Sequence, residues 1–220
     1  IKIITNGLYK ESNSKRMKSS VMIARNKVST HRNELYSHRK DIIKWYEKNA
    51  PNEFDLFGQG WDEKKIKLYP FHYLNRNKTI GRSLYRLFEK KLTVYKGTIK
   101  SKSQILSNYN FSYTYENIEG IKGYITEKII DSFFSLTIPI YRGADNILDY
   151  IPNELFIDSR NFDSIEDIHK YISSIRKDKI IAIRKDIIDF FQSKDSEIFC
   201  AGYNASIIAK EINANIKRKY

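Results

Sequence analysis

Four polar side chains in the middle of the chain fall where α/β proteins commonly gather their ligands. Asn117 follows an apolar run (residues 111–115) that is typical of a strand, and Glu127 and Lys128 begin a helical segment soon afterwards. Tyr124 lies in the glycine-containing loop between the strand and the helix. The carboxyl ends of strands and the N-termini of helices attract anions, because free N–H groups and the helix dipole favour negative charge there. The pattern predicts a site for a phosphorylated ligand.

Two basic residues would supply positive charge to such a site. Lys128 stands in the first turn of the predicted helix, where the helix dipole disfavours a cation unless an anion lies nearby. Arg39 falls on the same helical stripe as Leu35 and Ile42, so it should face the sheet and need a partner or a ligand there. A surface lysine and a structurally paired arginine are the plain alternatives. A guanidinium fork does, however, suit diphosphate oxygens.

The other three polar residues also have structural explanations. Glu127 suits the first turn of a helix for dipole reasons alone. Asn117 is a common turn residue, and Tyr124 would serve as a loop anchor. Residue type and position therefore leave both a binding role and a structural role open for each of them.

The elements that must position these residues alternate between strand and helix. Between the first two apolar runs, residues 34–48 carry apolar side chains at helical spacing. Ser164 and Asp167 have capping-box spacing and should open a helix that runs to residue 175. The alternation predicts an α/β fold with a doubly wound, Rossmann-like parallel sheet. The expected strands are 21–24, 54–57, 111–115, 137–141 and 155–157, and two last helices are expected at 178–192 and 205–217.

Composition and pattern divide the chain into three expected parts. Residues 1–20 are polar and are expected to be a linker or the end of a missing N-terminal domain, and residues 21–175 hold the alternating strands and helices of one domain. Within that domain, residues 62–96 hold ten Lys or Arg against three acidic residues and look inserted. Residues 176–220 are expected to be C-terminal helices.

The segment from residue 115 to residue 158 closely resembles the C-terminal signature of the glycosyltransferase family 10 fucosyltransferases. It reads Y-E-N, then Y-I-T-E-K, then I-P-I-Y-R-G and F-I-D, in the family's order. Upstream, residues 22–27, 34–39 and 54–61 resemble successive family blocks. The resemblance extends over about residues 20–165, and several ordered blocks are harder to meet by chance than one short motif.

The resemblance implies the donor-binding half of a two-domain GT-B enzyme, with residues 21–175 as its Rossmann-like GDP-fucose-binding domain. Such an enzyme is a fucosyltransferase, which moves fucose from GDP-fucose to a glycan acceptor, here expected to be N-acetylglucosamine in an α1,3 linkage, with inversion. It also implies that Arg39 and Lys128 contact the diphosphate, Asn117 the ribose and Glu127 the sugar hydroxyls, with Tyr124 beside the nucleotide. The resemblance places family members at Golgi membranes in eukaryotes, or in the cytoplasm or at the membrane periphery in bacteria.

No cofactor or metal ion is expected. The D-x-D motif that commonly holds a divalent cation in glycosyltransferases does not occur in the sequence. By the resemblance, the general base belongs to the N-terminal half, so the catalytic residue is expected to lie outside this chain, which begins without Met. Were a base present here, Glu116 and Glu119 would be the first candidates.

Net charge and cysteine content limit the other function classes. The chain of 220 residues has a net charge of +13 and a single cysteine, which rules out an intrachain disulfide. Apolar runs fall short of the roughly 20 residues of a membrane span. Two alternatives stay open: a non-catalytic sugar-nucleotide-binding or glycan-binding module, and, supported by charge alone, a basic nucleic-acid-binding protein. Nucleic acid is not the expected partner, whereas peripheral membrane association through the basic segments is left open.

Overall fold

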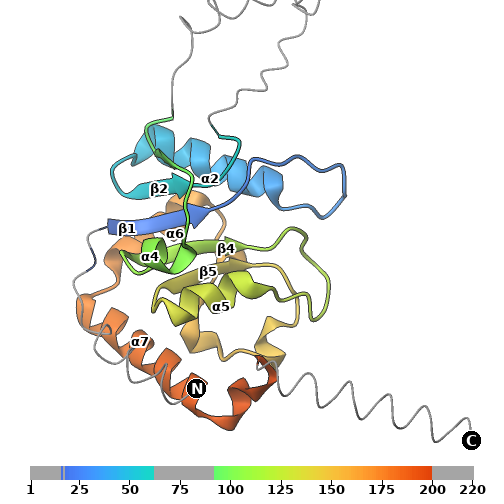
Figure 1. Cartoon of the computed structure of the whole chain (residues 1–220), viewed down its shortest axis with the longest axis vertical. Helices are drawn as coiled ribbons and strands as arrows, with labels where there is room; N and C mark the ends of the chain where they lie inside the picture. Colours follow the sequence, from blue (N-terminus) through green and yellow to red (C-terminus); the bar gives the residue numbers. More distant parts are fainter. Residues whose placement is uncertain (1–15, 17, 62–91, 200–220) are drawn as a thin grey trace, which may run out of the picture.

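The computed structural model describes residue 16 and residues 18–61 and 92–199. These residues form one six-stranded sheet in which every neighbouring pair is parallel, in the order β3-β2-β1-β4-β5-β6 (Figure 1). This is the strand order of a doubly wound Rossmann fold, so the expected fold class is confirmed. The strands are β1 (Lys18–Ile23), β2 (Phe54–Phe57), β3 (Tyr95–Gly97), β4 (Tyr109–Tyr115), β5 (Ile138–Arg142) and β6 (Ile157–Asp158).

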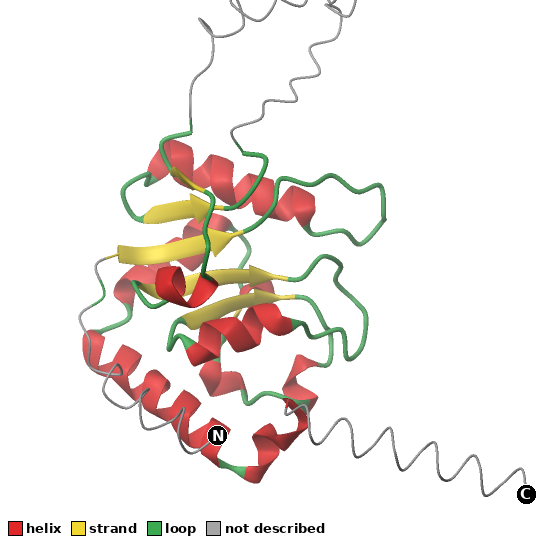
Figure 2. Ribbon diagram, viewed as in Figure 1, coloured by secondary structure: helices red, strands yellow, loops and turns green. Residues whose placement is uncertain are grey.

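Helices cover both faces of the sheet (Figure 2). In the view of Figure 1, α4 and α5 lie in front of the sheet and α6 lies behind it. Rings of α2 and α6 contact each other through Trp45, Tyr46 and His169, so these two helices share the rear face. The helices are α2 (Tyr36–Asn49), α4 (Lys102–Leu106), α5 (Glu127–Phe134), α6 (Ile165–Ser174) and α7 (Lys177–Gln192), with short 3-10 turns η2 (Ile147–Asp149), η3 (Asn153–Leu155), η4 (Ser159–Asn161) and η5 (Lys194–Phe199).

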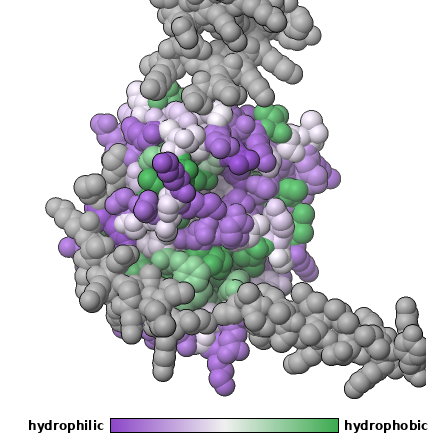
Figure 3. All heavy atoms as spheres, in the orientation of Figure 1, coloured by the Kyte–Doolittle hydropathy of each residue, from purple (hydrophilic) through white to green (hydrophobic). Residues whose placement is uncertain are grey.

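The core runs through both layers between helices and sheet. β4 is buried along nearly its whole length, as expected for a central parallel strand covered on both faces. Ile42 and Tyr46 of α2, Phe133 of α5 and Ile187 of α7 belong to the same hydrophobic cluster as the strands. Among the coloured residues of Figure 3, hydrophilic side chains predominate, and a hydrophobic band crosses the lower part of the coloured surface.

The predicted elements inside the described ranges are confirmed with small shifts. β1 begins at Lys18, three residues before the expected start, and α7 begins at Lys177. The Ser164 hydroxyl accepts a hydrogen bond from the Asp167 N–H, as the capping-box spacing predicts, and α6 follows. β3 was not predicted, because Tyr95–Gly97 is short and lacks an apolar pattern.

Some expectations fall outside the described residues. Most of the basic insertion and the expected helix at 205–217 lie there, as does most of the polar N-terminal segment. Among the described helices, none has the length and apolarity required to cross a bilayer.

Candidate functional site

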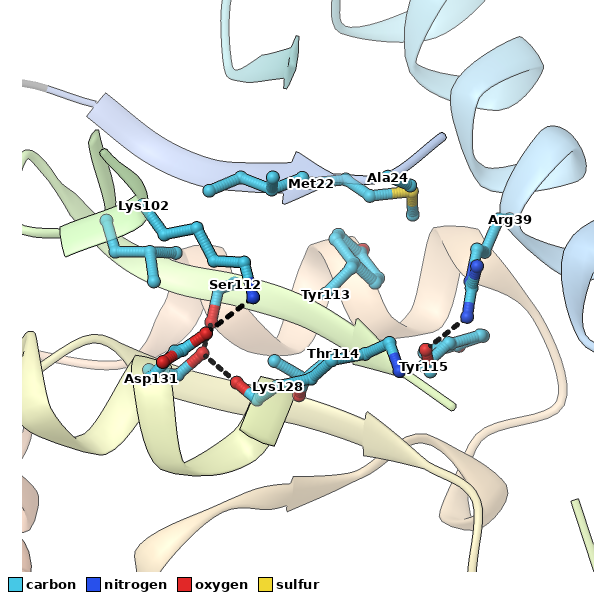
Figure 4. Close-up of a pocket in the computed structure, with 13 residues that line it drawn as sticks. Met22, Ala24, Arg39, Lys102, Ser112, Tyr113, Thr114, Tyr115, Lys128 and Asp131 are labelled. Atoms are coloured by element: carbon cyan, nitrogen blue, oxygen red, sulfur yellow. Dashed lines mark hydrogen bonds and ion pairs between the residues drawn. The ribbon is translucent and has the colours of Figure 1, made fainter. Parts of the chain in front are cut away.

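A small cleft opens where the two halves of the sheet meet. The winding direction reverses between β1 and β4, and ligands of doubly wound sheets bind outside the strand ends at such a point. Figure 4 shows the cleft between these strands, α4 and α5. Its cavity of about 40 Å³ has room for only a few water molecules, so a nucleotide would have to lie over its mouth. Polar and charged residues that line it include Arg39, Lys102, Ser112, Lys128, Asp131 and Ser132.

Lys128 lies in the first turn of α5 and is paired. Its ammonium group is 2.9 Å from Glu116 Oε2 and donates to Thr126 Oγ1 at 3.0 Å. The Glu116 side chain is fully buried, whereas that of Lys128 is 24% exposed. An ammonium group has three N–H donors, and the third makes no hydrogen bond within the described part of the chain. Lys128 is therefore neither a free surface lysine nor fully committed to structure.

The Glu116 carboxylate also closes the N-terminus of α5. Glu116 Oε1 accepts from the Thr126 N–H at 2.8 Å, and Oε2 accepts from the Thr126 hydroxyl at 2.7 Å. Thr126 is the N-cap residue, so a carboxylate from the end of β4 takes the part that Glu at N3 plays in a capping box. Glu116 was named from sequence only as a candidate base, and its anchoring of Lys128 was missed.

Arg39 is buried on α2 and reaches the end of β4. Its Nη2 donates to the carbonyl oxygens of Tyr115 at 2.6 Å and Glu116 at 2.7 Å, and to Asn117 Oδ1 at 3.1 Å. Within the described residues, its Nε and Nη1 make no hydrogen bond. Burial lowers the pKa of Arg39, while the neighbouring Tyr36 and Glu116 oppose that shift.

The start of α2 sets the position of Arg39. The Glu34 carboxylate accepts from the backbone N–H groups of Tyr36 and Ser37, and from the Ser37 hydroxyl. The Ser37 hydroxyl bond lowers the pKa of Glu34, because it stabilises the ionised form. Glu34 also forms a backbone bridge with Ile118, so the helix that carries Arg39 is fixed to the loop after β4.

The loop after β4 makes further contacts with the start of α2, with the end of β5 and with Asn146. The Leu35 N–H donates to the Asn117 carbonyl at 3.0 Å. Arg142 at the end of β5 binds both oxygens of the Glu119 carboxylate, with Nε to Oε2 at 2.6 Å. Gly123 N–H donates to Asn146 Oδ1 at 2.8 Å. Asn117 is thus a structural partner of Arg39, and its exposure is intermediate.

Tyr124 and Glu127 lie at the rim of the site. The Tyr124 side chain is half-buried and close enough to Arg39 to affect its pKa. Glu127 is exposed, with Oε1 3.4 Å from Lys102 Nζ. Burial alone would raise the pKa of Glu127, but its own backbone N–H, Lys128 and Lys102 together lower it. The structure therefore places all five predicted residues around the C-terminal end of β4 and the N-terminus of α5.

Lys102 of α4 is a further cation in the cleft that the sequence did not single out as a site residue. Its Nζ lies 2.7 Å from Asp131 Oδ2, and this pair is visible in Figure 4. Lys102 falls within the residues, about 20–165, over which the family resemblance extends. Lys102 faces two carboxylates, so the charge that it offers to a ligand is largely compensated. Burial would lower the pKa of Lys102, but Asp131 and Glu127 raise it overall.

The turn after β2 supports the end of β1. A Cβ atom at Gly58 would lie 1.9 Å from the Ala24 carbonyl oxygen, and Gly58 has φ +135°, so both space and backbone require glycine. The Trp61 indole N–H donates to that same oxygen at 2.7 Å. The Gly58 backbone therefore lies directly against the end of β1, and the Trp61 ring packs against the hydrophobic core.

Comparison with known proteins now identifies the family. The family model for glycosyltransferase family 10 (fucosyltransferase), C-terminal part, matches residues 14–184. The chain belongs to glycosyltransferase family 10. The family was expected from the ordered motifs, and that expectation is confirmed.

Curated relatives of this family 10 chain include two fucosyltransferases. Alpha-(1,3)-fucosyltransferase FucT of Helicobacter pylori is 33% identical over 152 residues, which cover 64% of this chain and 31% of the relative. An alpha-(1,4)-fucosyltransferase of Arabidopsis thaliana is 32% identical over 75 residues, covering 34% of this chain and 18% of the relative. The matched part of the chain thus spans less than a third of either relative's length.

Solved structures share the fold. A crystal structure of alpha1,3-fucosyltransferase with GDP-fucose matches with a TM-score of 0.52 at 21% identity, covering 86% of this chain and 51% of that one. A structure of alpha1,3-fucosyltransferase with GDP gives the same TM-score at 20% identity. The family 10 chain therefore has the fold of about half of such an enzyme.

Proposed function

We propose that this family 10 chain is the donor-binding part of a fucosyltransferase that uses GDP-fucose. The proposal rests chiefly on one observation: Arg39 and Lys128 stand at the sheet's switch point with uncommitted N–H donors. A Lys128 N–H and the Arg39 Nε and Nη1 groups make no hydrogen bond within the described residues. Donors of this kind suit the oxygens of a diphosphate. A related structure contains GDP-fucose, which makes that sugar nucleotide the first ligand to test.

The other rim residues would complete donor binding. Tyr124 would lie beside the nucleotide, Asn117 would contact the ribose and Glu127 would bind fucose hydroxyls. The positive end of the α5 dipole adds favourable potential for a phosphate. No metal ion is needed in this proposal, and no three His, Cys, Asp or Glu side chains among the described residues gather into a metal-holding group.

The reaction that follows is an inverting transfer to a glycan. An acceptor hydroxyl, proposed to be on N-acetylglucosamine for an α1,3 linkage, attacks the anomeric carbon of fucose opposite the departing GDP. Negative charge grows on the leaving diphosphate, and cations already in place there lower the barrier. Arg39 and Lys128 would have this role.

The two carboxylates considered as a general base are poorly placed for it. Glu116 is fully buried and accepts hydrogen bonds from Thr126 and Lys128. Glu119 is engaged by the Arg142 guanidinium. A base must reach the acceptor proton within hydrogen-bond distance. We therefore propose that the base comes from a part of the enzyme that corresponds to the unmatched length of the relatives.

Calorimetry with GDP, GDP-fucose and a DNA duplex at two salt concentrations tests the donor proposal. We expect the nucleotides to bind and the duplex not to compete. Preference for the duplex, with steep salt dependence and no nucleotide binding, would instead favour the nucleic-acid alternative.

A transfer assay separates an enzyme from a binding module. Labelled fucose transfer from GDP-fucose to N-acetyllactosamine should be weak with the 220-residue chain and strong with an upstream-extended version. Loss of a general base alone costs about 10²–10⁴-fold in rate. Donor binding without transfer by the extended version would favour the non-catalytic module.

A further inference from the structure

Glu116 contacts both cations of the candidate site with different atoms. Its carboxylate holds the Lys128 ammonium group, and its main-chain carbonyl accepts from Arg39 Nη2. The Glu116 N–H in turn donates to the Arg142 carbonyl at 2.8 Å, which fixes the residue to β5. A single residue at the end of β4 thus links the helices that carry Arg39 and Lys128.

The carboxylate solves an electrostatic problem at the start of α5. A lysine in the first turn of a helix is repelled by the positive end of the helix dipole. Without an opposing charge, the Lys128 side chain would turn toward solvent. Glu116 supplies that charge from beneath the site, where its fully buried carboxylate cannot itself meet a ligand.

Gly143 independently shows that space is reserved for this carboxylate. A Cβ atom at Gly143 would lie 2.5 Å from Glu116 Cγ and 2.5 Å from the Tyr141 hydroxyl. Gly143 does not have a positive φ, so the backbone itself would accept alanine. The requirement for glycine comes from the Glu116 side chain and its neighbour Tyr141.

We propose that Glu116 is a positioning residue, which orients Lys128 toward the phosphates of the donor without touching the donor. The inference rests on the proposed function, because it assigns Lys128 to the phosphates. It adds that the negative charge of Glu116 favours, rather than opposes, binding of an anion at this place.

Substitution Glu116→Gln distinguishes a positioning role from simple repulsion of the phosphates, because the two predict opposite changes in GDP affinity. Gln has one carbonyl oxygen, so in either amide orientation an N–H faces another donor, Thr126 N–H or the Lys128 ammonium group. The change also removes a negative charge near the phosphates, which by itself would strengthen GDP binding. If Glu116 positions Lys128, GDP affinity should nevertheless fall about fivefold. The binding free energy lost is then smaller than that of one charge-assisted hydrogen bond. GDP affinity equal to or greater than that of the parent would overturn the proposal.

Guanosine and two further variants separate positioning from general damage. Guanosine lacks phosphates, so its affinity should be the same in Glu116→Gln and in the parent. Gly143→Ala, which displaces Glu116 without changing charge, should lower GDP affinity in the same direction. The control Glu166→Gln removes a charge from an exposed pair with Lys170 on α6, so its GDP affinity should stay within about twofold of the parent. Equal losses for guanosine and GDP would indicate a loop defect and reject the proposal.

If the parent fails to bind GDP, the proposed function is refuted. A measurement without nucleotide then still tests whether Glu116 holds Lys128. The Lys128 ammonium signal in nitrogen-detected NMR should be protected from exchange in the parent and lost in Glu116→Gln. An unchanged signal in the variant would show that Glu116 does not hold Lys128.

Discussion

Strand β4 has a buried arginine at each end, and the two arginines differ in what surrounds them. At the start of the strand, Arg184 of α7 donates from Nε to the Leu136 carbonyl at 3.0 Å and from Nη2 to Asn110 Oδ1 at 2.8 Å. At the other end, and among the residues that the structure describes, Arg39 of α2 donates from Nη2 alone. Arg184 is 2% exposed and Arg39 is 5% exposed.

Burial acts on both guanidinium groups, but their charged neighbours differ: Tyr36 and Glu116 oppose the pKa shift at Arg39, whereas Arg16 adds to the shift at Arg184. Burial, with a smaller contribution from the charge of nearby Arg16, lowers the pKa of Arg184 to about 10. Burial also lowers the pKa of Arg39. Their locations also differ: Arg39 lies at the carboxyl edge of the sheet beside the switch-point cleft, and Arg184 lies at the opposite edge. We therefore expect a buried arginine to bind a ligand only where the fold leaves donors facing a cleft.

The largest effect should come from Arg184→Ala. The change leaves the Leu136 carbonyl and Asn110 Oδ1 without this donor, and should lower the free energy of unfolding by about 3 kcal/mol. GDP affinity of the folded protein should match the parent. Urea unfolding measures the first and calorimetry the second. The neighbouring exposed Lys185→Ala is the control, with an expected cost of about 0.5 kcal/mol or less. Loss of GDP binding in folded Arg184→Ala would contradict a purely structural role for Arg184.

Arg39→Ala should affect GDP affinity more than stability, the reverse of Arg184→Ala. GDP affinity is expected to fall about 30-fold, or about 2 kcal/mol, because charge-assisted contacts to phosphate are lost. Circular dichroism should still report a folded chain, although the acceptors at Tyr115 and Glu116 lose their donor and some stability goes with it. Parent-like GDP affinity in a folded variant would make Arg39 a structural residue like Arg184.

Lys128→Met tests the cation of the site that is paired with Glu116. GDP affinity should fall about tenfold, and the free energy of unfolding should fall by about 1–2 kcal/mol, because Glu116 stays buried without its partner. The double variant with Glu116→Gln should regain stability, whereas its GDP affinity should stay below that of the parent. Full return of GDP affinity to the parent value in the double variant would contradict a direct role for Lys128.

The smallest expected effect is that of chelation. EDTA should leave GDP affinity unchanged, because the proposed site neutralises phosphate charge with Arg39, Lys128 and helix N–H groups. Calorimetry with and without EDTA measures this. Affinity that drops on chelation and returns with added Mg²⁺ would refute metal-free binding.

Local sequence pattern predicted most of the described fold. Apolar runs and helical spacing depend on residues close together in the chain, so five of the strands and the Ser164 cap were accessible from sequence. β3 was not, since Tyr95–Gly97 is a strand only by pairing with β2. The ordered family motifs likewise brought Arg39, Asn117, Tyr124, Glu127 and Lys128 to one region before the structure placed them there.

Partners across the sheet were decided by tertiary structure alone. Arg39 and its first acceptor, the Tyr115 carbonyl, are 76 positions apart, and no local pattern encodes that contact. Glu116 and Lys128 are separated by a loop whose path depends on contacts with α2 and β5. By itself, the sequence determined which residue types were available at the strand and helix ends. The packed fold decided which carboxylate holds which cation, because burial and distance exist only once distant segments meet.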